Sequence, residues 1–231
     1  MSISSRACRI WSLFNNYRRG YGRNVFISHH ELVHPEAKIT NSKIHGRVHV
    51  GKNSIIKDCF ISARELHIGR NTSLWGPSID IHSRLNTVII GNFCSIARNV
   101  TMQEYNHRLD RCSTYFFSHR VFEEGVENDI MSRGPIIIGN DVWIASHVVI
   151  GSGATIGNGA VVGANSLVLS DIPPYAVVAG SPAKVLRYRF DENIVERLTS
   201  LKWWEWNDER ILQNRELFVE PLTTDVLDRI V

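Results

Sequence analysis

The sequence of 231 residues lacks the features of a membrane-spanning or secreted chain. It has no apolar run long enough to cross a bilayer, and its first residues show neither the apolar core nor the cleavage site of a signal peptide. The spacing C-x-x-C is also absent from its four cysteines, which argues against a thiolate metal site and a disulfide framework. We therefore expect a cytoplasmic protein with reduced cysteines.

Acidic residues are absent from the first 30 positions, which hold five arginines. Beyond them, 26 − 5 = 21 basic side chains stand against 23 acidic ones, so the rest of the chain carries a formal charge of 21 − 23 = −2. Because the basic excess is confined to a short segment, we expect no nucleic-acid partner. Apolar residues between the arginines indicate an amphipathic helix that caps the open end of the fold. Peripheral contact with the inner face of a membrane is the alternative.

A repeat of six residues runs from Ile138 to Pro173. Its second place is Gly or Ala in five of six copies, its fifth place is mostly small, and its first place is always aliphatic: Ile138, Ile144, Ile150, Ile156, Val162 and Val168. Neither the helical period of 3.6 nor the strand period of two produces this pattern. A unit that stacks on copies of itself predicts an all-β solenoid, here a β-helix with three six-residue faces per coil.

A weaker form of the repeat begins near Val33. Its expected inward positions are Ile44, Val50, Ile56, Ser62, Ile68 and Leu74, of which Ser62 breaks the apolar rule. The register slips after Ser78, which predicts an altered corner around Gly76-Pro77, and it resumes at Ile90. The repeat then stops over residues 103–137, a polar and aromatic segment that we expect to form a functional loop outside the coil.

The sequence leaves the hexapeptide pattern after Pro173. Asp191 is expected to cap a helix that presents Ile194 and Leu198 on one face, and the three tryptophans of residues 202–206 are expected to pack against the solenoid wall. The sequence thus predicts an N-terminal basic capping segment (1–32), a β-helix with its loop (33–185) and a C-terminal helical region (186–231).

Four features together resemble the left-handed β-helix acyltransferases. They are the hexapeptide array, the element GNDVWI at 139–144, the segment DIPPYAVVAGSPAKV at 171–185 and the loop word NHRLD at 106–110. The chain is most similar to the branch of xenobiotic acetyltransferases and bacterial polysaccharide O-acetyltransferases, over about residues 85–206. The resemblance implies a left-handed parallel β-helix, acetyl-CoA as co-substrate, no metal, and a homotrimer with active sites between adjacent prisms.

The same resemblance assigns His107 as the base that takes a proton from an acceptor hydroxyl. A neutral imidazole suits this role because an alcohol is a poor nucleophile at neutral pH. Glu104 or Asp110 is expected to orient the imidazole, and the sequence does not choose between them. His119 is a rival base, but it lies outside the motif.

Matching positions also imply where coenzyme A binds. Its pantetheine arm is expected along the coil edge, and two cations beyond the coil suit its phosphates. These positions are Trp143, Ala145, Ser146 and Ala164 on the coil, and Lys184 and Arg187 beyond it. Ala145 and Leu169 stand where the family often has Gly and Thr.

Four residues are expected to bind the acceptor: Trp75, Asp80, Tyr105 and Asn106. The word GPxxD at residues 76–80 and the long array of preceding coils resemble polysaccharide O-acetyltransferases. We therefore expect acetyl transfer to a sugar hydroxyl of a surface polysaccharide (O-antigen or capsule) or its precursor. Acetylation of chloramphenicol or a streptogramin and N-acetylation of a sugar are the alternatives.

Two other classes share this kind of solenoid. A zinc-dependent carbonic anhydrase needs three histidines, two of them five residues apart, and only His29 and His34 have that spacing. A noncatalytic trimeric scaffold would be expected to lose the loop histidine and the cation pair, and this chain has both.

Overall fold

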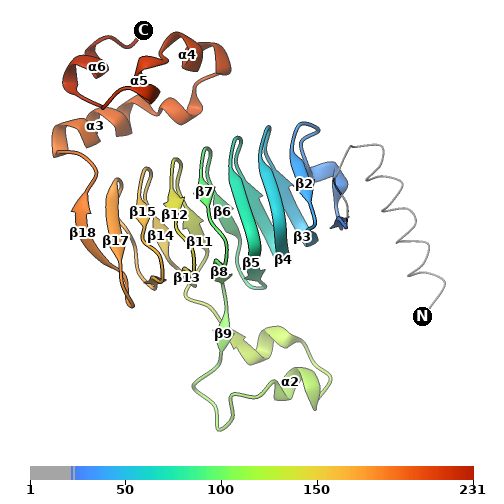
Figure 1. Ribbon diagram of the computed structural model, residues 1–231. Coiled ribbons are helices and arrows are strands. Elements are labelled where there is room, and N and C mark those ends of the chain that lie inside the picture. The colour runs from blue at the N-terminus through green and yellow to red at the C-terminus, as the bar shows by residue number, and fades with distance from the viewer. Residues whose placement is uncertain (1–21, 23) are drawn as a thin grey trace.

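The computed structural model describes residue 22 and residues 24–231 (Figure 1). The chain forms a parallel β-solenoid of about eight turns, followed by short helices, and the predicted fold class is confirmed. Most of the arginine-rich segment that we expected to cap the prism lies outside the described residues. Its last part forms β1 (Phe26–Ile27) and the 3-10 helix η1 (His30–Leu32).

Parallel strands of successive turns build three faces of the prism. The first face holds β2 (Lys38–Thr40), the starts of β4 (Ile55–Ile68) and β5 (Ser73–Ser83), β7 (Ser95–Ile96), β12 (Trp143–Ile144), β15 (Val161–Val162), β17 (Ala176–Ala179) and the antiparallel β18 (Lys184–Tyr188). The second face holds β1, the start of β3 (Lys43–Val50), the middle of β4, the end of β5, β8 (Thr101–Gln103), β13 (Val149–Gly151) and β16 (Leu167–Val168). The third face holds the ends of β3 and β4, β6 (Val88–Ile90), β11 (Ile136–Ile138) and β14 (Thr155–Ile156).

The aliphatic first places of the repeat fill the prism. From Ile138 to Val168 all six are at most 1% exposed, so the period of six marks the inward positions as predicted. Stacked coils bury these side chains in one continuous column, which is the main source of stability in a solenoid.

The early coils depart from the predicted register at Ser62. Ile61 is fully buried in its place, and Ser62 is only half-buried. The pairing of β4 with β5 shifts between Lys57 and Cys59, where Asp58 adopts a left-handed φ of 54°. The next inward position therefore arrives one residue early.

Tight edges join the faces. At the edge between the first and second faces, left-handed backbone angles recur on successive coils at Asn41, Asp58, Asn99, His147 and Asn165. Asn and Asp tolerate this conformation better than most residues, which explains their frequency here.

The predicted loop leaves the coil at the edge between the second and third faces. It contains β9 (Asn106–His107), α2 (Phe117–Arg120), the 3-10 helix η2 (Val126–Asp129) and β10 (Ile130–Met131). β9 and β10 pair antiparallel and form the neck of the loop, with His107 opposite Ile130. The buried Asp129 carboxylate accepts hydrogen bonds from the amides of Ser118 (3.0 Å) and His119 (2.8 Å) and so holds the start of α2.

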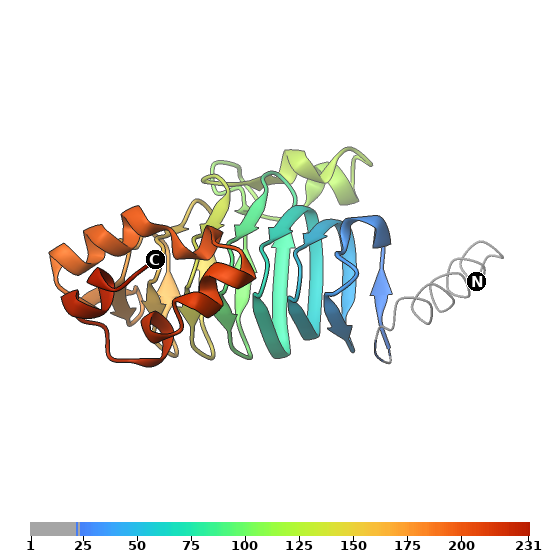
Figure 2. The same ribbon diagram turned by 90° about the horizontal axis from the view of Figure 1, so that it is seen from above.

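The C-terminal helices lie on the opposite side of the prism from this loop (Figures 1 and 2). They are α3 (Glu192–Leu201), the 3-10 helix η3 (Trp203–Glu205), α4 (Asp208–Gln213), α5 (Glu216–Val219) and α6 (Thr224–Asp228). As predicted, the Asp191 carboxylate accepts the amide hydrogen of Ile194 at 2.9 Å and caps α3. The tryptophans pack on the edge between the third and first faces, where Trp203 stacks 4.9 Å from Phe93. Within the described residues, no helix is both long and apolar enough to cross a membrane.

Candidate active site

Several of the predicted cofactor residues gather on one edge of the prism. Trp143 and Ser146, at the edge between the first and second faces, line a pocket of about 440 Å³ together with Trp75 and Arg98. The indole rings of Trp75 and Trp143 are 52% and 54% exposed, which is unusual for tryptophan and leaves both available for contact. Trp75, predicted for the acceptor, thus shares a pocket with residues predicted for coenzyme A.

The same edge continues over the next coils towards the C-terminal end of the prism. The amide of Ala145 donates to the Val162 carbonyl at 2.9 Å, and the amide of Asn165, next to Ala164, donates to the Ser146 carbonyl at 3.1 Å. Lys184 and Arg187 are exposed on β18, which closes the first face after the last coil. The backbone groups named here are thus paired between coils, and Lys184 and Arg187 lie on the strand that follows the last coil.

His107 lies on a different edge. It lines a second pocket of about 440 Å³ with Asn106, Met131, Arg133 and Ser152. Its imidazole is exposed and lies 4.5 Å from the ring of Phe116, centroid to centroid. The Asn106 amide donates to the Ser152 hydroxyl at 3.3 Å, which ties the neck of the loop to the coil.

One hydrogen bond selects the tautomer of the neutral His107 ring. Nδ1 lies 2.6 Å from the carbonyl oxygen of Thr114. Because a carbonyl can only accept, Nδ1 must carry the hydrogen, and a neutral ring then has its lone pair on Nε2. This arrangement makes Nε2 the proton acceptor. The Thr114 carbonyl was not expected from the sequence, since a backbone oxygen has no sequence signal.

Neither predicted carboxylate contacts the imidazole. Glu104 is fully buried, and its side chain accepts from the amides of Arg84 (3.0 Å) and Leu85 (2.9 Å) and from the Asn86 side chain (2.8 Å). These hydrogen bonds attach the start of the loop to the neighbouring coil. Burial alone would raise the pKa of this carboxyl, but hydrogen bonds from the Ser132 hydroxyl, the two amides and Asn86 outweigh it and lower the pKa.

Asp110 is occupied by a neighbour in the loop. Its carboxylate takes both the Nε (2.9 Å) and the Nη2 (2.5 Å) hydrogen bonds of Arg108, and this pair lowers the pKa of Asp110. The rival base His119 lies in α2, where its Nδ1 is 3.4 Å from the Glu124 carbonyl oxygen. Only His107 among these groups lines the pocket at the loop neck.

The remaining predicted acceptor residues do not converge in one chain. Asp80 lies on the second face, 2.8 Å from Nε2 of His82, in a broad groove of about 990 Å³ with Phe60 and Thr101. Tyr105 is half-buried, and its carbonyl accepts from the Gln103 side chain at 3.0 Å. Asn106 alone of the four shares the His107 pocket.

Comparisons with known proteins agree with this architecture. A family model described as bacterial transferase hexapeptide (six repeats) matches residues 135–170. A probable macrolide acetyltransferase of Lysinibacillus sphaericus is 41% identical over 56% of this chain and 76% of the relative. A chloramphenicol acetyltransferase of Agrobacterium fabrum is 43% identical over 54% and 62%, and a galactoside O-acetyltransferase of Escherichia coli K12 is 38% identical over 60% and 62%. The chain thus spans less than two thirds of the length of the last two relatives.

Among solved structures, the polysialic-acid-specific acetyltransferase NeuO superimposes with a TM-score of 0.55 at 24% identity, over 74% of this chain and 72% of that chain. This likeness concerns the fold. The repeat, the solenoid and a relative matched over three quarters of its length lead to one assignment: the chain belongs to the hexapeptide-repeat acyltransferase family.

Proposed function

We propose that the protein transfers an acetyl group from acetyl-CoA directly to a hydroxyl of a saccharide, with His107 as the general base. The observation that carries this proposal is the hydrogen bond from His107 Nδ1 to the Thr114 carbonyl, because it leaves Nε2 free to accept a proton in an open pocket. The family relationship supports acetyl transfer, since the matched relatives are acetyltransferases by name.

The proposed reaction needs no acyl-enzyme. Nε2 takes the acceptor proton as the hydroxyl oxygen attacks the thioester carbonyl, and a tetrahedral intermediate forms. When the carbon–sulfur bond breaks, the imidazolium returns its proton to the departing thiolate. The Thr114 carbonyl remains bonded to Nδ1 throughout and stabilises the positive ring.

Coenzyme A is proposed to bind along the edge between the first and second faces. The exposed rings of Trp75 and Trp143 can cover the pantetheine end, and Lys184 and Arg187 are placed further along the chain's first face, where cations suit phosphate oxygens. The Ser146 carbonyl already accepts a hydrogen bond from the Asn165 amide on the next coil. Polar contacts to the cofactor must therefore come from other groups at this edge.

The proposed base and the proposed cofactor residues lie on different edges of one prism. His107 leaves the coil between β8 and β11, whereas Trp143 and Ser146 lie between the first and second faces. A complete site therefore needs a second copy of the chain whose cofactor edge faces the loop of the first. This separation supports the homotrimer that the family resemblance implies.

The loop surface supports a saccharide acceptor. The loop exposes three aromatic rings, those of Tyr115, Phe117 and Phe122. The ring centroid of Phe117 lies 5.5 Å from that of Tyr115 and 6.1 Å from that of Phe122. Exposed aromatic faces beside polar groups suit a sugar in an open cleft, whereas a drug prefers a compact apolar pocket. The galactoside O-acetyltransferase relative is consistent with this choice. Drug acetylation is the second candidate because the macrolide and chloramphenicol relatives have higher identity.

The proposal is tested with a panel of acceptors. The full chain is incubated with acetyl-CoA and either saccharides, amino sugars, chloramphenicol or a macrolide, and the release of free thiol and the mass of the product are measured. We expect one added acetyl group on a saccharide oxygen. Efficient modification of chloramphenicol or a macrolide, with kcat/KM well above that for every saccharide, would overturn the acceptor class and leave the role of His107 intact.

A further inference from the structure

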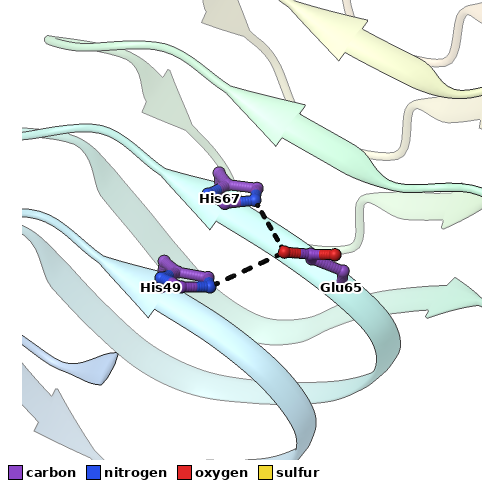
Figure 3. Close-up of side chains that lie close together, drawn as sticks. All are labelled: His49, Glu65 and His67. Atoms are coloured by element: carbon purple, nitrogen blue, oxygen red, sulfur yellow. Dashed lines mark hydrogen bonds and ion pairs between the residues drawn. The ribbon is translucent and has the colours of Figure 1, made fainter. Parts of the chain in front are cut away.

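A cluster of three ligand-type side chains lies on the third face, away from both proposed parts of the active site. His49 comes from β3, and Glu65 and His67 come from β4, one coil further along (Figure 3). His49 and His67 are direct neighbours in the parallel pairing of the two strands. They are 67 − 49 = 18 residues apart, which is one coil of three six-residue faces, so the fold itself stacks them.

The three side chains converge on one point. Glu65 Oε1 lies 3.2 Å from Nε2 of His67 and 3.8 Å from Nε2 of His49, and the three ligand atoms all lie within 4.8 Å of one another. The two imidazoles are stacked with centroids 4.4 Å apart and planes 9° from parallel, so both present Nε2 on the side of the carboxylate (Figure 3).

These separations match a tetrahedral metal site. Bonds of 2.0–2.1 Å at tetrahedral angles place two ligand atoms about 3.3–3.4 Å apart, and the two carboxylate–imidazole distances lie on either side of that value. The two imidazole Nε2 atoms, which lie within 4.8 Å of each other, must approach each other to bind one ion. We propose that His49, Glu65 and His67 bind one Zn²⁺ ion, with the fourth position open.

The surroundings of His49 point to the same conclusion. Its Nε2 is buried and makes no hydrogen bond within the described residues, although it is directed at the carboxylate. A hydrogen bond between Glu65 and His67 alone would leave His49 unexplained.

The two histidines also border an open surface groove of about 700 Å³. Its other lining residues include Val33, Pro35 and Ile89, and Glu65 is not among them. Ile89 follows His67 in the same column of the third face, so the two histidines are bounded by an apolar residue on the next coil. A metal here would join two coils near the N-terminal end of the prism. This assignment departs from the expectation of a metal-free protein, which considered thiolates and the His29–His34 spacing.

Zinc titration of the untagged full chain tests the proposal. The protein is treated with a chelator, dialysed, and titrated with Zn²⁺ against a chromogenic competitor, and its thermal unfolding is followed with and without the metal. We expect one saturable ion per chain and a higher unfolding temperature with Zn²⁺. The variant His67→Asn should weaken binding by more than about 100-fold, beyond the 10–100-fold that changes to outer partners of a site typically cost.

Two further variants distinguish a built site from general histidine binding. Glu65→Gln keeps the shape of the side chain and removes its charge, so binding should weaken while the zinc-free protein unfolds as the wild type does. His82→Asn is the matched control, because His82 also pairs with a carboxylate two residues away, Asp80 at 2.8 Å, but lacks a second histidine beside it. Its zinc affinity should equal that of the wild type. Equal weakening in His82→Asn and His67→Asn, or no saturable binding by the wild type, would overturn the proposal.

Discussion

The role of His107 depends on one backbone contact. Thr114 lies seven residues further along the loop, and its carbonyl fixes the hydrogen on Nδ1. A histidine held in this way needs no carboxylate to select its tautomer, because any fixed acceptor at Nδ1 has the same effect. Asp110 is therefore free to bind Arg108, and Glu104 is free to anchor the loop.

Removal of the His107 imidazole should affect turnover far more than folding. General-base catalysis typically contributes about 10²–10⁴-fold, so His107→Ala should lower kcat by roughly that factor with acetyl-CoA and the best acceptor. The unfolding temperature should hardly change because the ring is exposed. His119→Ala is the matched control in the same loop and should keep kcat within about twofold of the wild type. The reverse pattern would transfer the role of base to His119.

Glu104 is a positioning residue at the base of the loop. In Glu104→Gln an NH2 group replaces one carboxylate oxygen, so either the amides of Arg84 and Leu85, which share Oε2, or the Asn86 side chain at Oε1 loses its acceptor. We expect a loss of about 1–3 kcal/mol in the free energy of unfolding at pH 7, measured by denaturant titration. Glu123→Gln, an exposed carboxylate of the loop, should change little.

The pH dependence of this loss has a definite sign. The pKa of Glu104 is lowered from its ordinary value of 4.5, so its ionised form stabilises the fold above that pH. The contribution disappears as the pH falls through the lower pKa of the folded state. The difference in stability between the wild type and Glu104→Gln should therefore be constant near neutral pH and shrink below pH 4.5. A difference that is independent of pH would show that the charge is not the cause.

At the scale of single elements, the second place of the repeat needs glycine for a steric reason where the third face ends. A Cβ atom on Gly91 would lie 2.5 Å from the carbonyl oxygen of Gly139 on the next coil. The two coils cannot move apart to admit this Cβ atom without weakening the hydrogen bonds between them. Gly91→Ala should therefore lower the free energy of unfolding by about 1–3 kcal/mol. Gly125→Ala in the loop is the control, since its Cβ would meet only the flexible end of Glu127. Equal stability of the two variants, measured by thermal unfolding, would contradict this account of the edge.

The late coils could be predicted from sequence because every copy has six residues. The first-place residues from Ile138 to Val168 therefore all point into the prism, and each is buried as the others are. The early coils lose this regularity at Asp58, where a shift in strand pairing brings Ile61 into the core instead of Ser62. On the partner strand the shift had a signal, because the three residues between Trp75 and Ile79 stand opposite Asp58, at the corner that Gly76-Pro77 predicted.

The candidate site, too, could be predicted from the sequence only in part. Motifs led to the proposed base in the loop and to the proposed cofactor residues, but the hydrogen-bond partner of His107 had no motif, since Thr114 acts through its carbonyl. Glu104 was expected beside the base because it is near in sequence, yet an inward position of the coil takes its side chain to Arg84 and Leu85. The zinc ligands had a signal in the 18-residue spacing of His49 and His67, which becomes meaningful only once the coil length is known.

At the scale of the whole molecule, the three edges of the prism have different occupants. The loop with His107 leaves one edge, the exposed tryptophans lie at the second, and the C-terminal helices cover the third (Figures 1 and 2). The third edge is sealed by contacts such as the ion pair between Arg70 and Asp208, at 3.2 Å. Two edges thus remain for contact with other copies, and they are the edges that carry the two halves of the proposed site.

Mixed assemblies of two inactive variants test this division. One variant carries His107→Ala, and the other carries Ser146→Trp, which fills the pocket beside Trp75 and Trp143. Each should be nearly inactive alone. If an active site takes its base from one subunit and its cofactor edge from the next, every mixed cyclic trimer has one functional site among its three, because only one of its interfaces has the two variants in the required order. Co-expression with two different affinity tags and purification over both isolates the mixed trimers for assay. A mixed trimer as inactive as its parents would show that each site is completed within one chain, and the separation of the two edges would then require a large movement of the loop.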